Sequence, residues 1–123
     1  MRILITGHRG FIGSALMDAL KDDHDIAGLD SARPTPNQIT DHQCITKAPL
    51  PNDIDMVIHL AGIGGVRESI NRPAEYWKTN VLGTQRILEH YKHIRCLVAS
   101  SSTAYEPHLN PYAASKYVAE SIP

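Results

Sequence analysis

The stretch ITGHRGFIG, residues 5–13, decides the fold that the sequence predicts for the whole chain. It ends a short apolar run and places glycines at positions 7, 10 and 13. Apolar residues then recur at helical spacing from Phe11 to Leu20, so the glycines lie between a strand and a helix. We predict that Gly7 makes the sharp turn, that Gly10 lets a pyrophosphate approach the backbone, and that Gly13 lets the helix pack against its strand.

The remainder of the chain alternates between strand and helix patterns. Three further strands are predicted, in DIAGL (25–29), IDMVIHLAG (54–62) and IRCLVAS (94–100), and two further helices, from Pro73 to about Tyr91 and from Tyr112 to about Glu120. Residues 31–53 are expected to be loops with a short strand near Gln38–Ile39. Such alternation predicts an α/β fold, a Rossmann-type doubly wound parallel sheet with helices on its faces.

An acidic residue follows the second predicted strand, at a distance that gives the glycine loop a function. Asp30 lies 17 residues beyond Gly13, where its carboxylate can accept hydrogen bonds from both hydroxyls of an adenosine ribose. The N–H groups of Phe11 and Ile12, at the start of the helix, are expected to face the phosphates. The carboxylate also repels a 2′-phosphate, which favours NAD over NADP, although Arg33 nearby weakens this preference. The alternative is a glycine turn that binds no ligand.

A second group of polar residues lies near the C-terminal end of the sequence. PYAASK, residues 111–116, places Tyr112 and Lys116 four apart and therefore on one face of a helix. A phenol is a weak base at neutral pH, and an ammonium group one turn away favours the phenolate. Ser101 and Ser102 follow the last predicted strand, at the sheet edge where open α/β folds bind ligands. Without the other motifs, a solvated helix face would be the favoured interpretation of this tyrosine and lysine, and the order of the motifs along the chain is what favours a catalytic pair.

Length and composition limit the remaining choices. The chain has 123 residues and a net charge of −1, so it is about one domain, and bulk charge gives no reason to expect nucleic acid or a membrane surface as partner. Its apolar runs are shorter than the roughly 18 residues of a membrane span. Cys44 and Cys96 lack metal-like or redox-like spacing, which predicts reduced thiols in a soluble, cytoplasmic domain.

Taken in order, these motifs resemble the N-terminal part of the extended short-chain dehydrogenase/reductase family, which contains NAD-dependent sugar-nucleotide epimerases and dehydratases. TGHRGFIGS, LD at 29–30, VIHLAG, TNVLGT, SSSTAYE and YAASK carry the resemblance, which covers essentially all 123 residues. It implies that Leu60, Ala61 and Gly62 line the NAD site and that Asn80 supports the active site beside the cofactor. Tyr112 and Lys116 would also touch NAD.

The segment AGIGGVRESINRP, residues 61–73, is most similar to UDP-uronate and UDP-hexose 4-epimerases. It makes Arg67 a candidate for binding a substrate phosphate or carboxylate, with a plain surface arginine as the alternative. One position and one loop length depart from the family pattern. Gln38 stands where most members carry an aspartate that contacts adenine, and only ten residues separate Ser101 from Tyr112, where relatives have a longer loop.

The resemblance implies epimerisation of a nucleotide sugar at C4 through a transient 4-keto intermediate. Because segment 61–73 is most similar to epimerases of UDP-linked sugars, the nucleotide is expected to be UDP. Tyr112 would remove the O4 proton, Ser101 would orient the hydroxyl with Ser102 nearby, and Lys116 would tune the tyrosine. A 4,6-dehydratase normally has Asp-Glu where this chain has Ser102-Thr103, which argues against that reaction. Reduction or decarboxylation of a nucleotide sugar stays open, and so does a non-catalytic NAD-binding fragment.

Residues 1–123 are therefore expected to form an incomplete NAD-binding domain, lacking the last strands of the sheet and the substrate domain. The resemblance also predicts a homodimer through helices 73–91 and 111–120. We expect His59 to be a packed strand residue and the Tyr76–Trp77 pair to pack the long helix, either within the chain or against a dimer partner. His90 and His93 have no third ligand in the sequence pattern, so no metal site is predicted.

Overall fold

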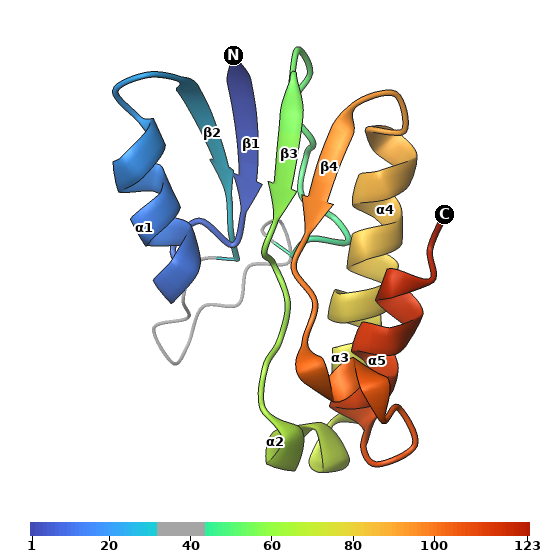
Figure 1. Cartoon of the computed structure of the whole chain (residues 1–123). Coiled ribbons are helices and arrows are strands. Elements are labelled where there is room, and N and C mark those ends of the chain that lie inside the picture. The colour runs from blue at the N-terminus through green and yellow to red at the C-terminus, as the bar shows by residue number, and fades with distance from the viewer. Residues whose placement is uncertain (32–43) are drawn as a thin grey trace.

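The computed structural model of the chain describes residues 1–31 and 44–123. Its described strands form one parallel sheet in the order β2-β1-β3-β4 (Figure 1). The strands are β1 (Arg2–Thr6), β2 (Asp25–Leu29), β3 (Met56–His59) and β4 (Arg95–Val98). In the register of the sheet, Ile5 pairs with Gly28 on one side and with Ile58 on the other. The predicted parallel sheet is confirmed, whereas the strand predicted at Gln38–Ile39 lies outside the described residues.

The helices complete the alternating pattern. They are α1 (Phe11–Leu20), α2 (Val66–Asn71), α3 (Pro73–Tyr76), the π-helical turn η2 (Trp77–Leu82), α4 (Gly83–His90), the 3₁₀ turn η3 (Ser102–Tyr105) and α5 (Pro111–Glu120). The step from β1 through α1 to β2 and the step from β3 through α4 to β4 run in opposite directions across the sheet, so right-handed crossovers place α1 and α4 on opposite faces. The Rossmann-type arrangement is thus confirmed, although α2 and the π-turn inside the predicted long helix were not predicted.

The largest part of the core lies between the sheet and α4. Leu4 and Val57 point from β1 and β3 toward Ile87 and Tyr91, and all four side chains are at most 3% exposed. Tyr91 also donates a hydrogen bond from its hydroxyl to the carbonyl of Pro51, at 2.6 Å. Within the described part of the chain, none of the helices combines the length and apolar character needed to cross a membrane.

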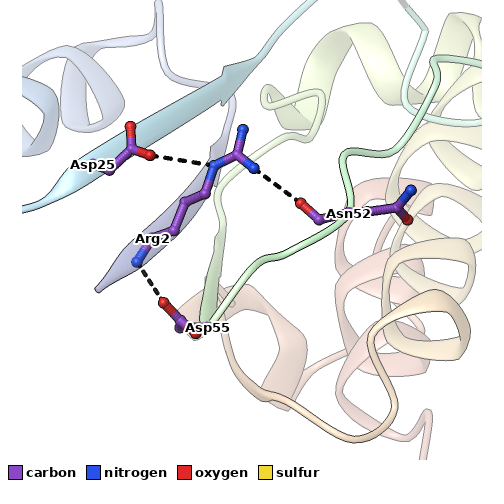
Figure 2. Close-up of polar contacts among 4 residues, drawn as sticks. All are labelled: Arg2, Asp25, Asn52 and Asp55. Carbon is purple, nitrogen blue, oxygen red and sulfur yellow. Dashed lines mark hydrogen bonds and ion pairs between the residues drawn. The ribbon is translucent and has the colours of Figure 1, made fainter.

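The edge of the sheet where the strands begin is held by Arg2 (Figure 2). Its backbone N–H donates to the Asp55 carboxylate at 2.6 Å, and its guanidinium donates to the Asn52 carbonyl at 3.1 Å. The guanidinium Nε also lies 3.4 Å from a carboxylate oxygen of Asp25, across the β1–β2 pair. These contacts connect the starts of β1 and β2 with the loop before β3 and leave the opposite edge for the site.

Candidate functional site

A cleft opens at the edge where the strands end, between β1 and its two neighbours. Its volume is about 270 Å³, and it lies where the strand order reverses direction, the usual ligand position in open α/β sheets. Six residues predicted to bind a cofactor line it: Gly7, Gly10, Asp30, Leu60, Ala61 and Gly62. The glycine loop, the acidic residue after β2 and the segment after β3 therefore come together at one cleft.

The glycine loop has the close backbone approaches that its spacing predicted. Gly7 has φ +72°, and a Cβ atom there would lie 2.9 Å from the backbone N of Ala61. A Cβ on Gly13 would overlap the carbonyl oxygen of Gly7, so α1 can approach the loop only because position 13 lacks a side chain. The Gly7 N–H donates to the Leu29 carbonyl at 2.7 Å, which fastens the loop to β2.

The N-terminus of α1 and the Asp30 carboxylate lie next to each other. Gly10 is the N-cap residue, and among the described residues no side chain caps this end of the helix. Asp30 accepts a hydrogen bond from the Arg9 N–H at 2.8 Å, so one carboxylate oxygen is held by the loop while the group lines the cleft. Backbone donors and a fixed carboxylate beside a glycine cradle suit a phosphate-bearing ribonucleoside.

Other predicted cofactor residues lie around this cleft rather than in its lining. Phe11 and Ile12 are the first two residues of α1, and they are 93% and 60% exposed, so a contact of their backbone N–H groups with a phosphate stays a prediction. Gln38 lies outside the described residues. Six further residues line the cleft without having been predicted: Leu29, Ser31, Cys44, Ile45, Ile63 and Thr79. Leu29, Ser31, Ile63 and Thr79 adjoin predicted residues, whereas Cys44 and Ile45 follow a stretch that lacks a motif.

Tyr112 and Lys116 lie one helical turn apart on α5. The Asn110 side chain caps this helix by accepting from the Ala113 N–H at 2.8 Å, and Pro111 is its first residue. The Lys116 ammonium donates to the Ala99 carbonyl at 3.4 Å, and a Cβ on Gly62 would lie 3.3 Å from the same nitrogen. Burial lowers the pKa of Lys116 below its ordinary value. This lysine thus reaches from α5 to the wall of the cleft.

The serines and the arginine predicted to meet a substrate have different environments. Ser101 is the N-cap residue of η3, where its Oγ accepts from the Thr103 N–H at 3.3 Å and lies 2.9 Å from the Thr103 hydroxyl. The short η3 turn packs against α5, so Ser101 and Tyr112 belong to adjoining elements. Ser102 and Arg67 are both exposed, and Arg67 lies on α2.

Asn80 connects the cleft wall with α5 and is itself only 1% exposed. Its Oδ1 accepts from the Ile63 N–H at 2.8 Å, while its Nδ2 donates to the Ile63 carbonyl at 3.1 Å and to the Ser115 hydroxyl at 3.0 Å. Both ends of the carboxamide are occupied by the protein. Asn80 therefore supports the site from behind, and a direct contact with a cofactor stays a prediction without geometric support.

His59 is the last residue of β3 and is 2% exposed. The Thr84 hydroxyl donates to the Asn80 carbonyl at 2.7 Å and therefore accepts from His59 Nε2 at 3.0 Å. His59 Nδ1 must then accept, from the Thr6 hydroxyl at 2.6 Å, and Thr6 accepts in turn from the Ala61 N–H at 3.1 Å. Burial, with a contribution from the charge of Lys116, lowers the pKa of His59 to about 4.

The neutral histidine thus joins β1 and β3 to η2 and α4 through a chain of hydrogen bonds. Each group in this chain donates to the next one in the same direction, from the Ala61 N–H to the Asn80 carbonyl. Its neutral state and full set of partners agree with the expected structural role and not with acid–base chemistry. Among residues 1–31 and 44–123 there is no group of three or more His, Cys, Asp or Glu side chains arranged to hold a metal ion.

Comparison with known proteins identifies the family of this chain. The model of the NAD dependent epimerase/dehydratase family matches residues 3–122. The chain belongs to this family. Its glycine loop, Asp30 and the Tyr112–Lys116 pair thus lie in a sequence that matches the family model over nearly its whole length.

Individual members of the family resemble the chain in sequence and in structure. UDP-glucose 4-epimerase of Yersinia enterocolitica is 33% identical over 159 residues, which include 99% of this chain and 47% of the relative. The solved structure of MoeE5 in complex with UDP-glucose and NAD has a TM-score of 0.84 and 32% identity, covering 99% of this chain and 48% of that one.

UDP-glucuronic acid 4-epimerase from Bacillus cereus, solved in complex with NAD, has a TM-score of 0.78 and 27% identity; the match covers 99% of this chain and 51% of that one. The chain thus spans about half the length of the curated relatives that it matches.

Proposed function

We propose that residues 1–123 are the NAD-binding part of an enzyme that epimerises a nucleotide sugar at C4. The observation that carries the proposal is the position of Lys116. Its ammonium extends from the helix of Tyr112 to Gly62, in the wall of the cleft formed by the glycine loop and Asp30. A dinucleotide site and a tyrosine–lysine pair are thereby joined, which is what an oxidation at a sugar hydroxyl requires.

The cleft suits NAD because the glycine cradle leaves no room for side chains at positions 7 and 13. In the proposal, the N–H groups at the start of α1 hold the pyrophosphate, and the free oxygen of Asp30 accepts from the adenosine ribose. Gln38 remains the predicted partner of the adenine. NAD bound there would supply a reversible hydride acceptor.

The residues of this chain would handle the proton and the orientation of the sugar. Tyr112 takes the proton from O4 as the C4 hydroxyl is oxidised and returns it when the 4-keto group is reduced. The Lys116 ammonium stabilises the phenolate one helical turn away and donates to the nicotinamide ribose. The Ser101 hydroxyl, on the element that adjoins α5, orients the reacting oxygen.

The substrate class is proposed from the relatives, several of which are named UDP-glucose 4-epimerase. Arg67, exposed on α2, would bind a phosphate or carboxylate of such a UDP-linked sugar, and Ser102 would lie at the rim. Most contacts to the sugar would come from the half of the relatives that this chain does not span. The same residues would serve a dehydratase, reductase or decarboxylase, and the absence of Asp-Glu at 102–103 disfavours the dehydratase.

We also propose a homodimer through the helical regions 73–91 and 111–120. Support comes from large apolar side chains that are about half exposed there, namely Trp77 at 45%, Leu82 at 47% and Tyr117 at 49%. These side chains lie on η2 and α5, which pack against each other and thus present adjoining surfaces. The proposed cellular location is the cytoplasm. Sedimentation equilibrium at several concentrations would measure the mass of the assembly.

The experiment that tests the proposal combines the full-length protein with NAD and, separately, UDP-glucuronate, UDP-glucose and UDP-N-acetylglucosamine. Proton NMR of the sugar would follow inversion at C4, and calorimetry would follow NAD binding. We expect inversion of at least one sugar, together with binding of NAD. Binding of NAD without turnover of any of the three would instead favour a non-catalytic NAD-binding protein.

A further inference from the structure

Tyr76, at the end of α3, contacts two parts of the site at once. Its side chain is 1% exposed, and its hydroxyl donates to the Gly64 carbonyl at 2.7 Å. Its ring meets the ring of Tyr112 edge to face, with 6.2 Å between the ring centres and an angle of 81° between the planes. One buried residue thus connects the segment after β3 with the helix of the proposed catalytic tyrosine.

The hydroxyl of Tyr76 fixes a segment that is otherwise open. Gly62 and Ile63 line the cleft, and Gly64 and Gly65 lead from there into α2, which carries Arg67. A Cβ on Gly64 would meet nothing within 4 Å, and Gly65 has φ +102°, a conformation that favours glycine. Two exposed glycines give this segment little intrinsic stiffness, so the hydrogen bond from Tyr76 holds it at its centre.

The ring of Tyr76 limits the position of the Tyr112 phenol. Tyr112 is half-buried near the start of α5, and its side chain has only two rotatable bonds to fix. The edge of one ring against the face of another is a favoured geometry for two aromatic side chains, so the contact stabilises the Tyr112 ring in the position seen here. The Asn110 cap holds the backbone at the start of α5, so the two contacts act together on the position of the phenol.

We propose that Tyr76 is a positioning residue with two separable tasks. Its ring orients Tyr112 for proton transfer, and its hydroxyl sets the segment from Gly64 to Arg67 against the substrate. This inference rests on the proposed function, because it takes Tyr112 to be the catalytic base and Arg67 to face the sugar nucleotide. Tyr76 itself would not touch the reacting atoms.

The two tasks predict different kinetic effects for two substitutions in the full-length protein. Tyr76→Phe removes only the hydrogen bond to Gly64, so KM for the sugar nucleotide should rise about 3- to 10-fold with kcat nearly unchanged. Tyr76→Leu also removes the ring contact, so kcat should fall about 10- to 100-fold. Equal changes of kcat in the two variants would overturn the division of tasks.

Tyr91 provides the matched control, because it is another buried tyrosine whose hydroxyl donates to a backbone carbonyl, that of Pro51. Tyr91→Phe and Tyr91→Leu lose the same groups in the core under α4, away from the cleft. They should leave kcat and KM within about twofold of wild type at a temperature where all variants are folded. If the Tyr91 variants reproduce the kinetic losses of the Tyr76 variants, the effect is one of stability and the proposal fails.

A measurement that needs no turnover separates this proposal from the proposed function. In protein labelled with ¹³C in the tyrosine rings, the Tyr112 signals should shift in Tyr76→Leu and stay in place in Tyr76→Phe and in both Tyr91 variants. Unchanged Tyr112 signals in Tyr76→Leu would refute the ring contact. If the signals shift as expected while wild-type protein epimerises no nucleotide sugar, the contact stands and the proposed function falls.

Discussion

The two edges of the sheet hold their polar side chains in opposite ways. Where the strands begin, the ion pair of Arg2 and Asp25 has side chains that are 40% and 75% exposed (Figure 2). Where the strands end, His59 and Asn80 are at most 2% exposed and fully hydrogen-bonded to neighbours. Water can replace a lost partner at the first edge but not at the second, so substitutions at the second edge should cost far more.

The largest effect is expected from Tyr112→Phe at the second edge. Removing the phenolic oxygen removes the proposed base, and epimerisation by the full-length protein should fall by about 10²- to 10⁴-fold while NAD stays bound. Steady-state kinetics and calorimetry of the same preparation measure both quantities. Tyr105→Phe, at a tyrosine that is 91% exposed, is the control and should leave both unchanged. A fully active Tyr112→Phe variant would refute the assigned role.

Gly13→Ala should have the next largest effect. The new methyl group would overlap the Gly7 carbonyl, and relieving this overlap must displace either α1 or the loop. We expect a loss of about 3 kcal/mol or more in the free energy of unfolding, measured by urea denaturation, together with weaker NAD binding. Gly64→Ala is the matched control, because a Cβ at that position meets nothing within 4 Å. Equal stability of the two variants would contradict the close packing of α1.

The buried histidine predicts how stability depends on pH. Because folding lowers the pKa of His59 from 6.5 to about 4, its stabilising contribution is complete above pH 6.5 and is lost as the pH falls to about 4. The loss amounts to about 3 kcal/mol at most. Urea denaturation at several pH values measures it, as the difference between wild type and His59→Gln in the slope of the free energy of unfolding against pH. His108→Gln, at an exposed histidine, should keep the wild-type slope; a wild-type slope in His59→Gln would refute the assignment.

Asp25→Asn, at the edge where the strands begin, should have the smallest effect. The Asp25 carboxylate is 75% exposed and lies 3.4 Å from Arg2 Nε, so its loss should change the free energy of unfolding by less than about 1 kcal/mol and leave NAD binding unaltered. Chemical denaturation at low and at high salt checks this, since a surface ion pair weakens as salt rises. If Asp25→Asn lowered the free energy of unfolding as much as Gly13→Ala, the expected difference in cost between the two edges of the sheet would be wrong.

Local sequence patterns were sufficient for the framework of the molecule. Glycine spacing predicted the loop because backbone sterics act between neighbours, and apolar runs predicted every strand from β1 to β4. Helical spacing predicted α5 in the same way, from Tyr112 to about Glu120. These features depend on residues within one or two turns of each other, so a single sequence contains the information.

The supporting contacts of the site depend on tertiary pairing and were therefore not predictable. The link between Asn80 and Ser115 joins residues 35 positions apart, and nothing in either local pattern points to the other. Tyr76 was predicted to pack the long helix, but its contacts with Gly64 and Tyr112 arise only when α3, α5 and the glycine segment meet. The Trp77 side chain, expected to pack the long helix or a dimer partner, is 45% exposed, so its packing against a partner stays a prediction.

Calorimetric titration of the protein with NAD and with NADP tests whether the cleft beside Asp30 is an NAD site. We expect one NAD per chain and binding of NADP that is about tenfold or more weaker, because the fixed carboxylate repels a 2′-phosphate. Asp30→Asn should narrow the difference between the two affinities. Absence of NAD binding, or equal affinities for NAD and NADP that Asp30→Asn leaves unchanged, would show that Asp30 does not mark an NAD site.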